Sequence, residues 1–175
     1  MSRLVRRSFR SPALQWLATV AQGWADQPAV WRPLVHYGAT GRWVEPLLVN
    51  DHSEVWLQGW PAGEHVELHD HGGASGALCV VQGVLAEAWA AGPDAARLRH
   101  RRLRPGAASA FGPEYVHDVV NTGRGQALSI QVYSPRLVAM TFYARRGRRL
   151  EAVRTELSDH PVITPAEAPV PAFRP

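Results

Sequence analysis

The stretch LHDHGGASGALCVVQG, Leu68 to Gly83, decides the fold, because it joins two histidines, a glycine-rich turn and an apolar run in immediate succession. Alternate residues of a β-strand face the same side, so His69 and His71 are expected to point one way and Asp70 the other. Two imidazoles on one face can take adjacent positions on a metal ion. A His-x-His pair is a weak signal by itself, so its meaning depends on the residues around it.

Further residues outside the pair strengthen the metal prediction. A glycine precedes the pair by six positions, Gly83 closes the stretch, and His117 lies in GPEYVHDVVN with Asn121 four residues later. This spacing is that of the two cupin motifs, in which glycines let the chain turn at strand ends. It predicts an all-β fold, a cupin in the form of a small β-barrel or jelly-roll, in which His69, His71 and His117 hold one metal ion. Imidazole ligands suit iron, copper, nickel and zinc alike, so ligand type does not choose the metal.

The rest of the chain fits a barrel preceded by helices. Ser11-Pro12 predicts a helix start with Ser11 as the N-cap, and a second short helix is expected over 29–37. From Trp43 onward, short apolar or alternating runs are separated by turn residues, which is typical of closely spaced strands. The expected strands are 44–49, 54–60, 64–69, 77–81, 84–90, 98–103, 108–111, 117–121, 127–133 and 139–143.

Length and composition indicate one domain with two flanking segments. A chain of 175 residues is long enough for a single sizeable core. We expect an N-terminal helical segment at 1–41 that packs on the barrel and a cupin barrel at 42–157. The segment 158–175 is rich in proline and is expected to lack regular structure.

Charge and hydropathy limit the partners of the protein. The net charge is +4, and all 19 basic residues are arginine, with clusters at 3–10 and 97–104. We interpret these clusters as solvated, because no aromatic residues interleave with them to stack bases. No apolar run approaches the roughly 20 residues that cross a bilayer, and the single cysteine suits a reducing compartment. We therefore expect a cytoplasmic protein, a monomer or weak homo-oligomer, with no nucleic-acid or membrane partner.

Three segments, HDHGGASGALCVVQG, VHDVVN and SIQVYSP, together resemble the thiol dioxygenases of the cysteine dioxygenase family, in their bacterial form. The resemblance implies that His69, His71 and His117 bind ferrous iron, Fe(II). It also implies that the partners are a small thiol, cysteine or a related compound, and O2. Both oxygen atoms are then added to sulfur to give a sulfinate.

The third segment implies the catalytic residues. The family has a Ser-x-His-x-Tyr run in which the tyrosine hydroxyl lies near the substrate, and here Ser129, Gln131 and Tyr133 occupy these positions on one strand face. Gln131 stands where the family has histidine. An amide can bridge Ser129 and Tyr133 by donating and accepting, but it cannot take up a proton near neutral pH as imidazole can.

The substrate-binding residues are less clearly indicated. Family members that act on amino-acid thiols carry an arginine on an early strand, where it binds the substrate carboxylate. The corresponding place here falls near Glu45-Pro46, and neither residue forms the bidentate guanidinium–carboxylate pair. Arg42 and Arg136 are the alternative candidates. If Glu45 faces the cavity, it attracts an amine, which indicates a cationic thiol or one without a carboxylate.

Several alternatives stay open. A common cupin has a glutamate ligand soon after the histidine pair; Gly76 stands at that place, and Glu67 is an alternative ligand because it shares the parity of His69. Gly76 also occupies the place of a cysteine that some animal members crosslink to tyrosine, so no crosslink is expected. With Gly76 inward, Cys79 faces outward, between barrel and helices. Two other functions remain: a metal-dependent cupin isomerase or epimerase, and a non-catalytic cupin that binds a small molecule.

Overall fold

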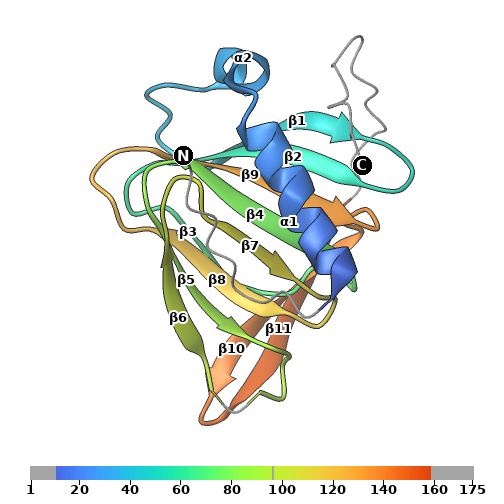
Figure 1. The fold of residues 1–175 in the computed structure, drawn as a ribbon. Helices are drawn as coiled ribbons and strands as arrows, with labels where there is room; N and C mark the ends of the chain where they lie inside the picture. The colour runs from blue at the N-terminus through green and yellow to red at the C-terminus, as the bar shows by residue number, and fades with distance from the viewer. Residues whose placement is uncertain (1–10, 96, 159–175) are drawn as a thin grey trace.

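The computed structural model describes residues 11–95 and 97–158, which form two facing antiparallel sheets with helices outside one of them (Figure 1). One sheet has the order β1-β2-β9-β4-β7, and the other has the order β11-β10-β3-β8-β5-β6. This is the jelly-roll of a cupin, as the sequence predicts. The strands are β1 (Trp43–Val49), β2 (Glu54–Trp60), β3 (His65–His69), β4 (Ser75–Gln82), β5 (Leu85–Ala90), β6 (Arg99–Leu103), β7 (Ala108–Phe111), β8 (Val116–Asn121), β9 (Ala127–Ser134), β10 (Ala139–Arg146) and β11 (Arg149–Leu157).

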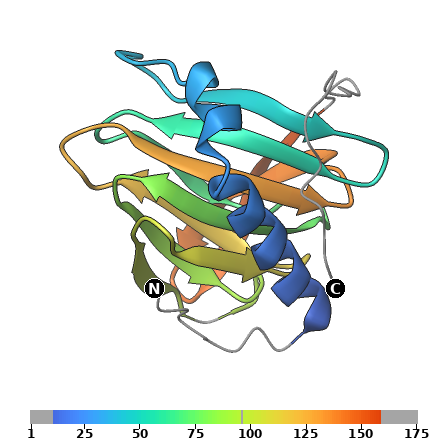
Figure 2. The same cartoon turned by 45° about the horizontal axis from the view of Figure 1, so that its top comes forward.

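The helices form a short N-terminal layer on the five-stranded sheet. Helix α1 (Pro12–Ala25) lies across β4, β7 and β9 (Figures 1 and 2). Ser11 is the N-cap as expected, but its side chain makes no capping bond, so the start relies on Pro12, whose fixed φ suits the first helical position. The second helix is shorter than expected: α2 (Pro28–Trp31) runs into the 3-10 turn η1 (Arg32–Leu34) and ends there.

The ten expected strands all form, and each begins and ends within a few residues of its predicted limits. The structure adds an eleventh, β11, which the hydrophobic pattern does not show. This strand lies at the edge of its sheet and buries only Leu150, so almost every one of its positions tolerates a polar side chain. Edge position thus explains why apolar alternation is missing there.

The core lies in two places, one beneath α1 and one between the sheets. Leu17, Ala21 and Trp24 of α1 pack against Leu57 and Ile130 on the outer face of the five-stranded sheet. Two further apolar clusters include buried residues of the barrel strands, such as Phe111 in one and Leu78 and Val119 in the other. The polar residues that are buried beside these clusters are therefore the candidates for a functional site.

Gly76 and Cys79 face opposite sides of β4, as predicted. A Cβ on Gly76 would lie 2.5 Å from the ring of Phe111 inside the barrel. The Cys79 thiol instead lies in the outer core, with Sγ 3.6 Å from Gln22 Oε1 of α1. Burial raises the pKa of Cys79 to about 12, so this thiol stays protonated.

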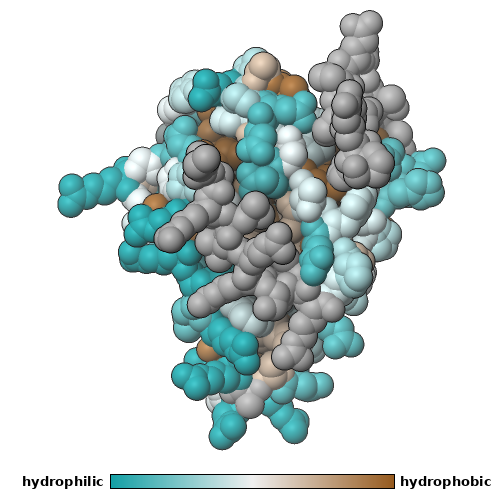
Figure 3. Space-filling model, in the orientation of Figure 1, coloured by the Kyte–Doolittle hydropathy of each residue, from teal (hydrophilic) through white to brown (hydrophobic). Residues whose placement is uncertain are grey.

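The end of the molecule formed by β6, β10 and β11 (Figure 1) is mainly hydrophilic on the face shown in Figure 3. Arg97, Arg99, Arg102 and Arg104 are exposed, in agreement with a solvated cluster, whereas Arg101 turns partly inside.

Neither described α-helix is long and apolar enough to span a membrane. Residues 1–10 and 159–175 lie outside the described part of the chain, and most of the predicted irregular segment 158–175 falls there. The domain boundaries at 41/42 and 157/158 stay predictions.

The packing of α1 gives a test of the fold. Leu57→Ala removes a fully buried side chain from the cluster beneath the helix, so it is expected to lower the free energy of unfolding by about 2–5 kcal/mol. The matched control Leu157→Ala changes a side chain that is 86% exposed and is expected to cost no more than about 0.5 kcal/mol. Urea unfolding followed by tryptophan fluorescence measures both, and equal losses would contradict this packing.

Candidate metal centre

Three histidines meet inside the barrel. His69 ends β3, His71 follows two residues later, and His117 lies on β8 directly opposite His69. All three are buried, and their ligating nitrogens lie within 4.8 Å of one another. Nε2 of His71 and Nε2 of His117 are 3.2 Å apart. The structure therefore brings together the three residues that the sequence predicts as metal ligands.

Asp70 fixes the turn that carries the histidine pair. Its backbone N–H donates to Thr141 O on β10 at 2.9 Å, and the Tyr143 hydroxyl donates to its Oδ2 at 2.7 Å. Gly72 then turns the chain with φ +57°, and a Cβ there would lie 2.7 Å from the backbone oxygen of Ala139. Asp70 faces away from the cluster, as strand parity predicts, and fastens the histidines to the neighbouring strand.

Glu67 is not a ligand, and the prediction that it shares the inward side of His69 is wrong. The β3–β8 pairing shifts register between Val66 and His69. Such an irregularity reverses which side the following residues face. Val66 and His69 therefore both line the interior, while the Glu67 carboxylate is exposed and contacts Arg154 Nη2 at 2.7 Å.

Hydrogen bonds orient two of the imidazoles for metal binding. Nδ1 of His69 donates to the backbone oxygen of Glu67 at 2.7 Å, and Nδ1 of His117 lies 2.8 Å from Glu87 Oε1. With its proton on Nδ1, each ring presents the Nε2 lone pair to the centre of the cluster. Burial, followed by the charge of His117, lowers the pKa of His69 to about 3 and that of His71 well below its usual range. Both rings are therefore neutral at physiological pH, the form that binds metal ions.

These residues fit a divalent cation. Nε2 of His117 is an acceptor because its proton lies on Nδ1, so Nε2 of His71, only 3.2 Å away, must share a proton or a cation with it. Nδ1 of His71 is buried and has no hydrogen-bond partner among the described residues, while its ring stacks on Phe111 with the centroids 4.5 Å apart. Three imidazole nitrogens form a set that suits iron and other transition metals.

Glu87 is a site residue that the sequence reasoning missed. Its buried carboxylate accepts hydrogen bonds from His117 Nδ1, from the Tyr115 hydroxyl at 2.9 Å and from Arg101 Nε. Burial alone would raise the pKa of Glu87, but the hydrogen bonds and charges of His117 and Arg101 lower it to about 2. An ionised carboxylate behind a metal-binding histidine fixes the tautomer and strengthens the ligand. A signal was present, since Glu87 shares strand parity with Leu85 in an apolar run.

A cavity of about 230 Å³ opens beside the histidines. Its polar lining comes from His69, His117, Tyr133, Gln131, Gln58 and Arg42, together with Glu156 and Ser158 at the end of β11. Its remaining wall is largely apolar and includes Trp56, Trp60 and Met140. The volume lies below the roughly 300–1,000 Å³ of pockets that hold drug-sized ligands, so this space suits a small molecule.

In the structure, Gln131 does not bridge Ser129 and Tyr133 as the sequence suggested. The Tyr133 hydroxyl donates to Gln131 Oε1, and Gln131 Nε2 donates to Gln58 Oε1 at 3.1 Å. Ser129 Oγ instead accepts a hydrogen bond from Trp60 Nε1 at 3.0 Å. Gln58 thus takes the place that was expected for Ser129. Burial raises the pKa of Tyr133, so its hydroxyl stays protonated.

Of the three candidate substrate-binding residues, only Arg42 lines the cavity. Arg42 Nη1 lies 3.5 Å from Gln58 Oε1. Glu45 lies on the other face of β1, where its Oε1 is 2.7 Å from His36 Nε2, so the condition for an amine-binding Glu45 is not met. Arg136 Nε contacts the buried carboxylate of Glu54 at 3.2 Å, and Arg136 does not line the cavity.

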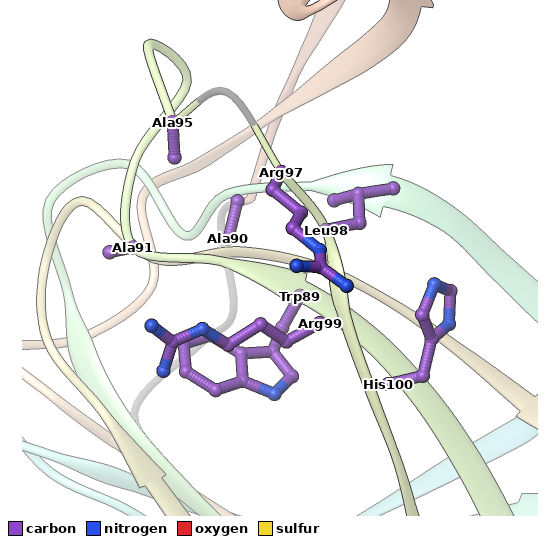
Figure 4. A pocket seen from close by; sticks show the side chains of 8 residues that line it. All are labelled: Trp89, Ala90, Ala91, Ala95, Arg97, Leu98, Arg99 and His100. Atoms are coloured by element: carbon purple, nitrogen blue, oxygen red, sulfur yellow. The ribbon is translucent and has the colours of Figure 1, made fainter.

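A larger hollow of about 670 Å³ lies beside the connection between β5 and β6 (Figure 4). Trp89 and Arg99 line it, with the guanidinium 5.2 Å from the indole centroid. None of the three clustered histidines borders this hollow. The metal-binding group therefore belongs to the smaller cavity between the sheets.

A jelly-roll that holds three buried histidines at one end of an interior cavity defines a cupin with a metal-binding group. The model of the family described as cysteine dioxygenase type I matches residues 5–146, and the chain belongs to this family. All three histidines lie within the matched residues.

Solved structures share the fold at low sequence identity. The protein TT1209 from Thermus thermophilus is 21% identical, with a TM-score of 0.52 over 60% of this chain and 93% of that one. An oxalate oxidase is 17% identical, with a TM-score of 0.53 over 62% of this chain and 58% of its own. No curated protein matches the sequence. These similarities establish the architecture alone.

The Glu87 carboxylate gives a test of the metal centre. Glu87→Gln keeps the shape of the side chain but weakens its hydrogen bond from His117, so metal affinity is expected to fall about 10–100-fold. The matched control Glu67→Gln changes an exposed carboxylate and leaves the backbone oxygen that His69 contacts. Competition with a chelator of known affinity measures both variants, and equal affinities would contradict a role for Glu87 in orienting His117.

Proposed function

We propose that the protein is an iron(II)-dependent thiol dioxygenase that converts a small thiol, cysteine or a related compound, into a sulfinate. The reaction is R–SH + O2 → R–SO2H. Sulfur loses four electrons and O2 gains four, so the overall conversion needs no other reductant. The carrying observation is the cluster of His69, His71 and His117 beside a small cavity, in a chain of the cysteine dioxygenase type I family.

The donor set supports this chemistry. The three imidazoles are uncharged ligands, and no carboxylate among the described residues joins the cluster. A thiol that binds as thiolate supplies the negative charge that a carboxylate ligand would otherwise bring. Ferrous iron held by these histidines would supply binding positions for sulfur and the electron density that activates O2.

The cavity supports a small substrate kept away from bulk water. Trp56, Trp60 and Met140 provide apolar walls, and the indole of Trp60 is fixed by its hydrogen bond to Ser129 Oγ. Such walls exclude water and strengthen the electrostatic interactions inside. Ser129 is thus a positioning residue for the wall, while Tyr133 presents its hydroxyl to the substrate with Gln131 as its partner.

Arg42 is the residue we assign to an anionic group of the substrate. It lies at the cavity, its guanidinium is always charged, and it is 5.7 Å from the centroid of the Trp60 ring. Glu45 and Arg136 are assigned no contact with the substrate, because their charged groups face His36 and Glu54.

Oxygen uptake tests the activity. Protein loaded with ferrous iron without oxygen is expected to consume one O2 per sulfinate formed with cysteine or a related thiol. His117→Ala removes a ligand and is expected to abolish uptake, whereas His65→Ala, an exposed histidine of β3, retains it. Sulfinate is measured by mass spectrometry. Conversion of a carbonyl substrate without any thiol-dependent uptake would instead support a cupin isomerase or epimerase.

Charge at the cavity gives a second test. Arg42→Gln is expected to raise KM for the anionic thiol 3-mercaptopropionate about tenfold more than KM for the cationic thiol cysteamine. Glu45→Ala is expected to leave the ratio of the two KM values unchanged, because Glu45 faces His36. A ratio that responds to Glu45 and not to Arg42 would contradict both assignments.

A further inference from the structure

A line of hydrogen bonds crosses the five-stranded sheet from the cavity mouth to Tyr133. Arg42 stands just before β1, Gln58 lies on β2, and Gln131 and Tyr133 lie on β9. Val44 pairs with Gln58, and Trp56 pairs with Gln131, so the polar residues are diagonal neighbours on adjacent strands. Diagonal neighbours on one sheet face are within reach of long side chains.

The charge of Arg42 sets the direction of this line. A guanidinium only donates, so the atom of Gln58 that faces Arg42 Nη1 at 3.5 Å is the oxygen Oε1. The reverse orientation would bring the Gln58 NH2 group against the guanidinium, with two donors face to face. Gln58 Oε1 also lies 3.1 Å from Gln131, which must therefore turn its Nε2 toward Gln58.

The orientation of Gln131 in turn sets the direction of the hydrogen bond made by Tyr133. Because Gln131 directs Nε2 at Gln58, its Oε1 faces the Tyr133 hydroxyl. An amide oxygen can only accept, so the Tyr133 proton is committed to Gln131 and points away from the ligand. A histidine at 131 has two tautomers and can serve Tyr133 as either donor or acceptor, whereas this amide is held in one orientation by Arg42.

We infer that Tyr133 is a hydrogen-bond acceptor toward the substrate, so the site selects small thiols that carry an O–H or N–H donor near sulfur. Arg42, Gln58 and Gln131 are the positioning residues. This inference rests on the proposed function for its substrate class, but the direction of the tyrosine hydrogen bond does not depend on it.

The hydroxyl direction is tested in the protein without metal. The Raman doublet of tyrosine distinguishes a hydroxyl that donates from one that accepts, and the Tyr133 contribution is the difference between wild type and Tyr133→Phe. A donor signature is expected. It is expected to disappear in Gln131→Leu and to persist in Ser134→Ala, in which the neighbouring β9 hydroxyl that donates to His52 O is removed. An acceptor signature in the wild type would overturn the inference.

Selectivity is tested with two uncharged thiols, 2-mercaptoethanol and 2-methoxyethanethiol, which differ by the hydroxyl donor. Binding to the Co(II)-loaded protein without oxygen is followed by cobalt absorption. The wild type is expected to bind 2-mercaptoethanol about tenfold more tightly, and the preference is expected to vanish in Tyr133→Phe and in Gln131→Leu. Equal binding by the wild type overturns the selectivity alone, whereas no binding of either thiol overturns both the selectivity and the proposed thiol site.

Discussion

The structure depends on the convergence of three buried imidazoles between the two sheets. Nε2 of His71 and Nε2 of His117 lie 3.2 Å apart, so they must share a proton or a cation. The barrel maintains this arrangement through hydrogen bonds at Nδ1 of two rings. The backbone oxygen of Glu67 accepts from His69, and the Glu87 carboxylate accepts from His117. The irregular pairing of β3 turns His69 toward the interior, and the Asp70 contacts with β10 hold the turn that carries His71.

Burying Glu87 beside this cluster has an electrostatic cost that the surrounding residues offset. A carboxylate removed from water is unfavourable unless its oxygens are fully hydrogen-bonded and its charge is balanced. Tyr115 and His117 donate to it, and Arg101 provides the opposite charge from the partly open edge of β6. Arg101 therefore differs from its exposed neighbours in the same basic cluster, since it stabilises the metal centre from outside.

Features that depend on a local sequence pattern were predicted correctly. Features that depend on how distant strands pair were not. The spacing of His69, His71 and His117 predicted the fold and the histidines that the structure brings together, because turn glycines and strand parity are local properties. The parity of Glu67 was misleading, since an irregular pairing with β8 cannot be read from β3 alone. Gln58 could not be found for a similar reason: its contact with Gln131 exists only because β2 pairs with β9 in one particular register.

The two sheets divide the site between them. The six-stranded sheet and the turn after β3 provide the imidazoles, while the five-stranded sheet provides the wall formed by Gln58, Gln131 and Tyr133. The sheets still meet at the site, because the ring of His71 stacks on Phe111 of β7 in the five-stranded sheet. Gln131 makes its side-chain hydrogen bonds within its own sheet, donating to Gln58 and accepting from Tyr133. The hydrogen bonds that orient the cavity wall therefore belong to one sheet, whereas the histidines are held by contacts from both.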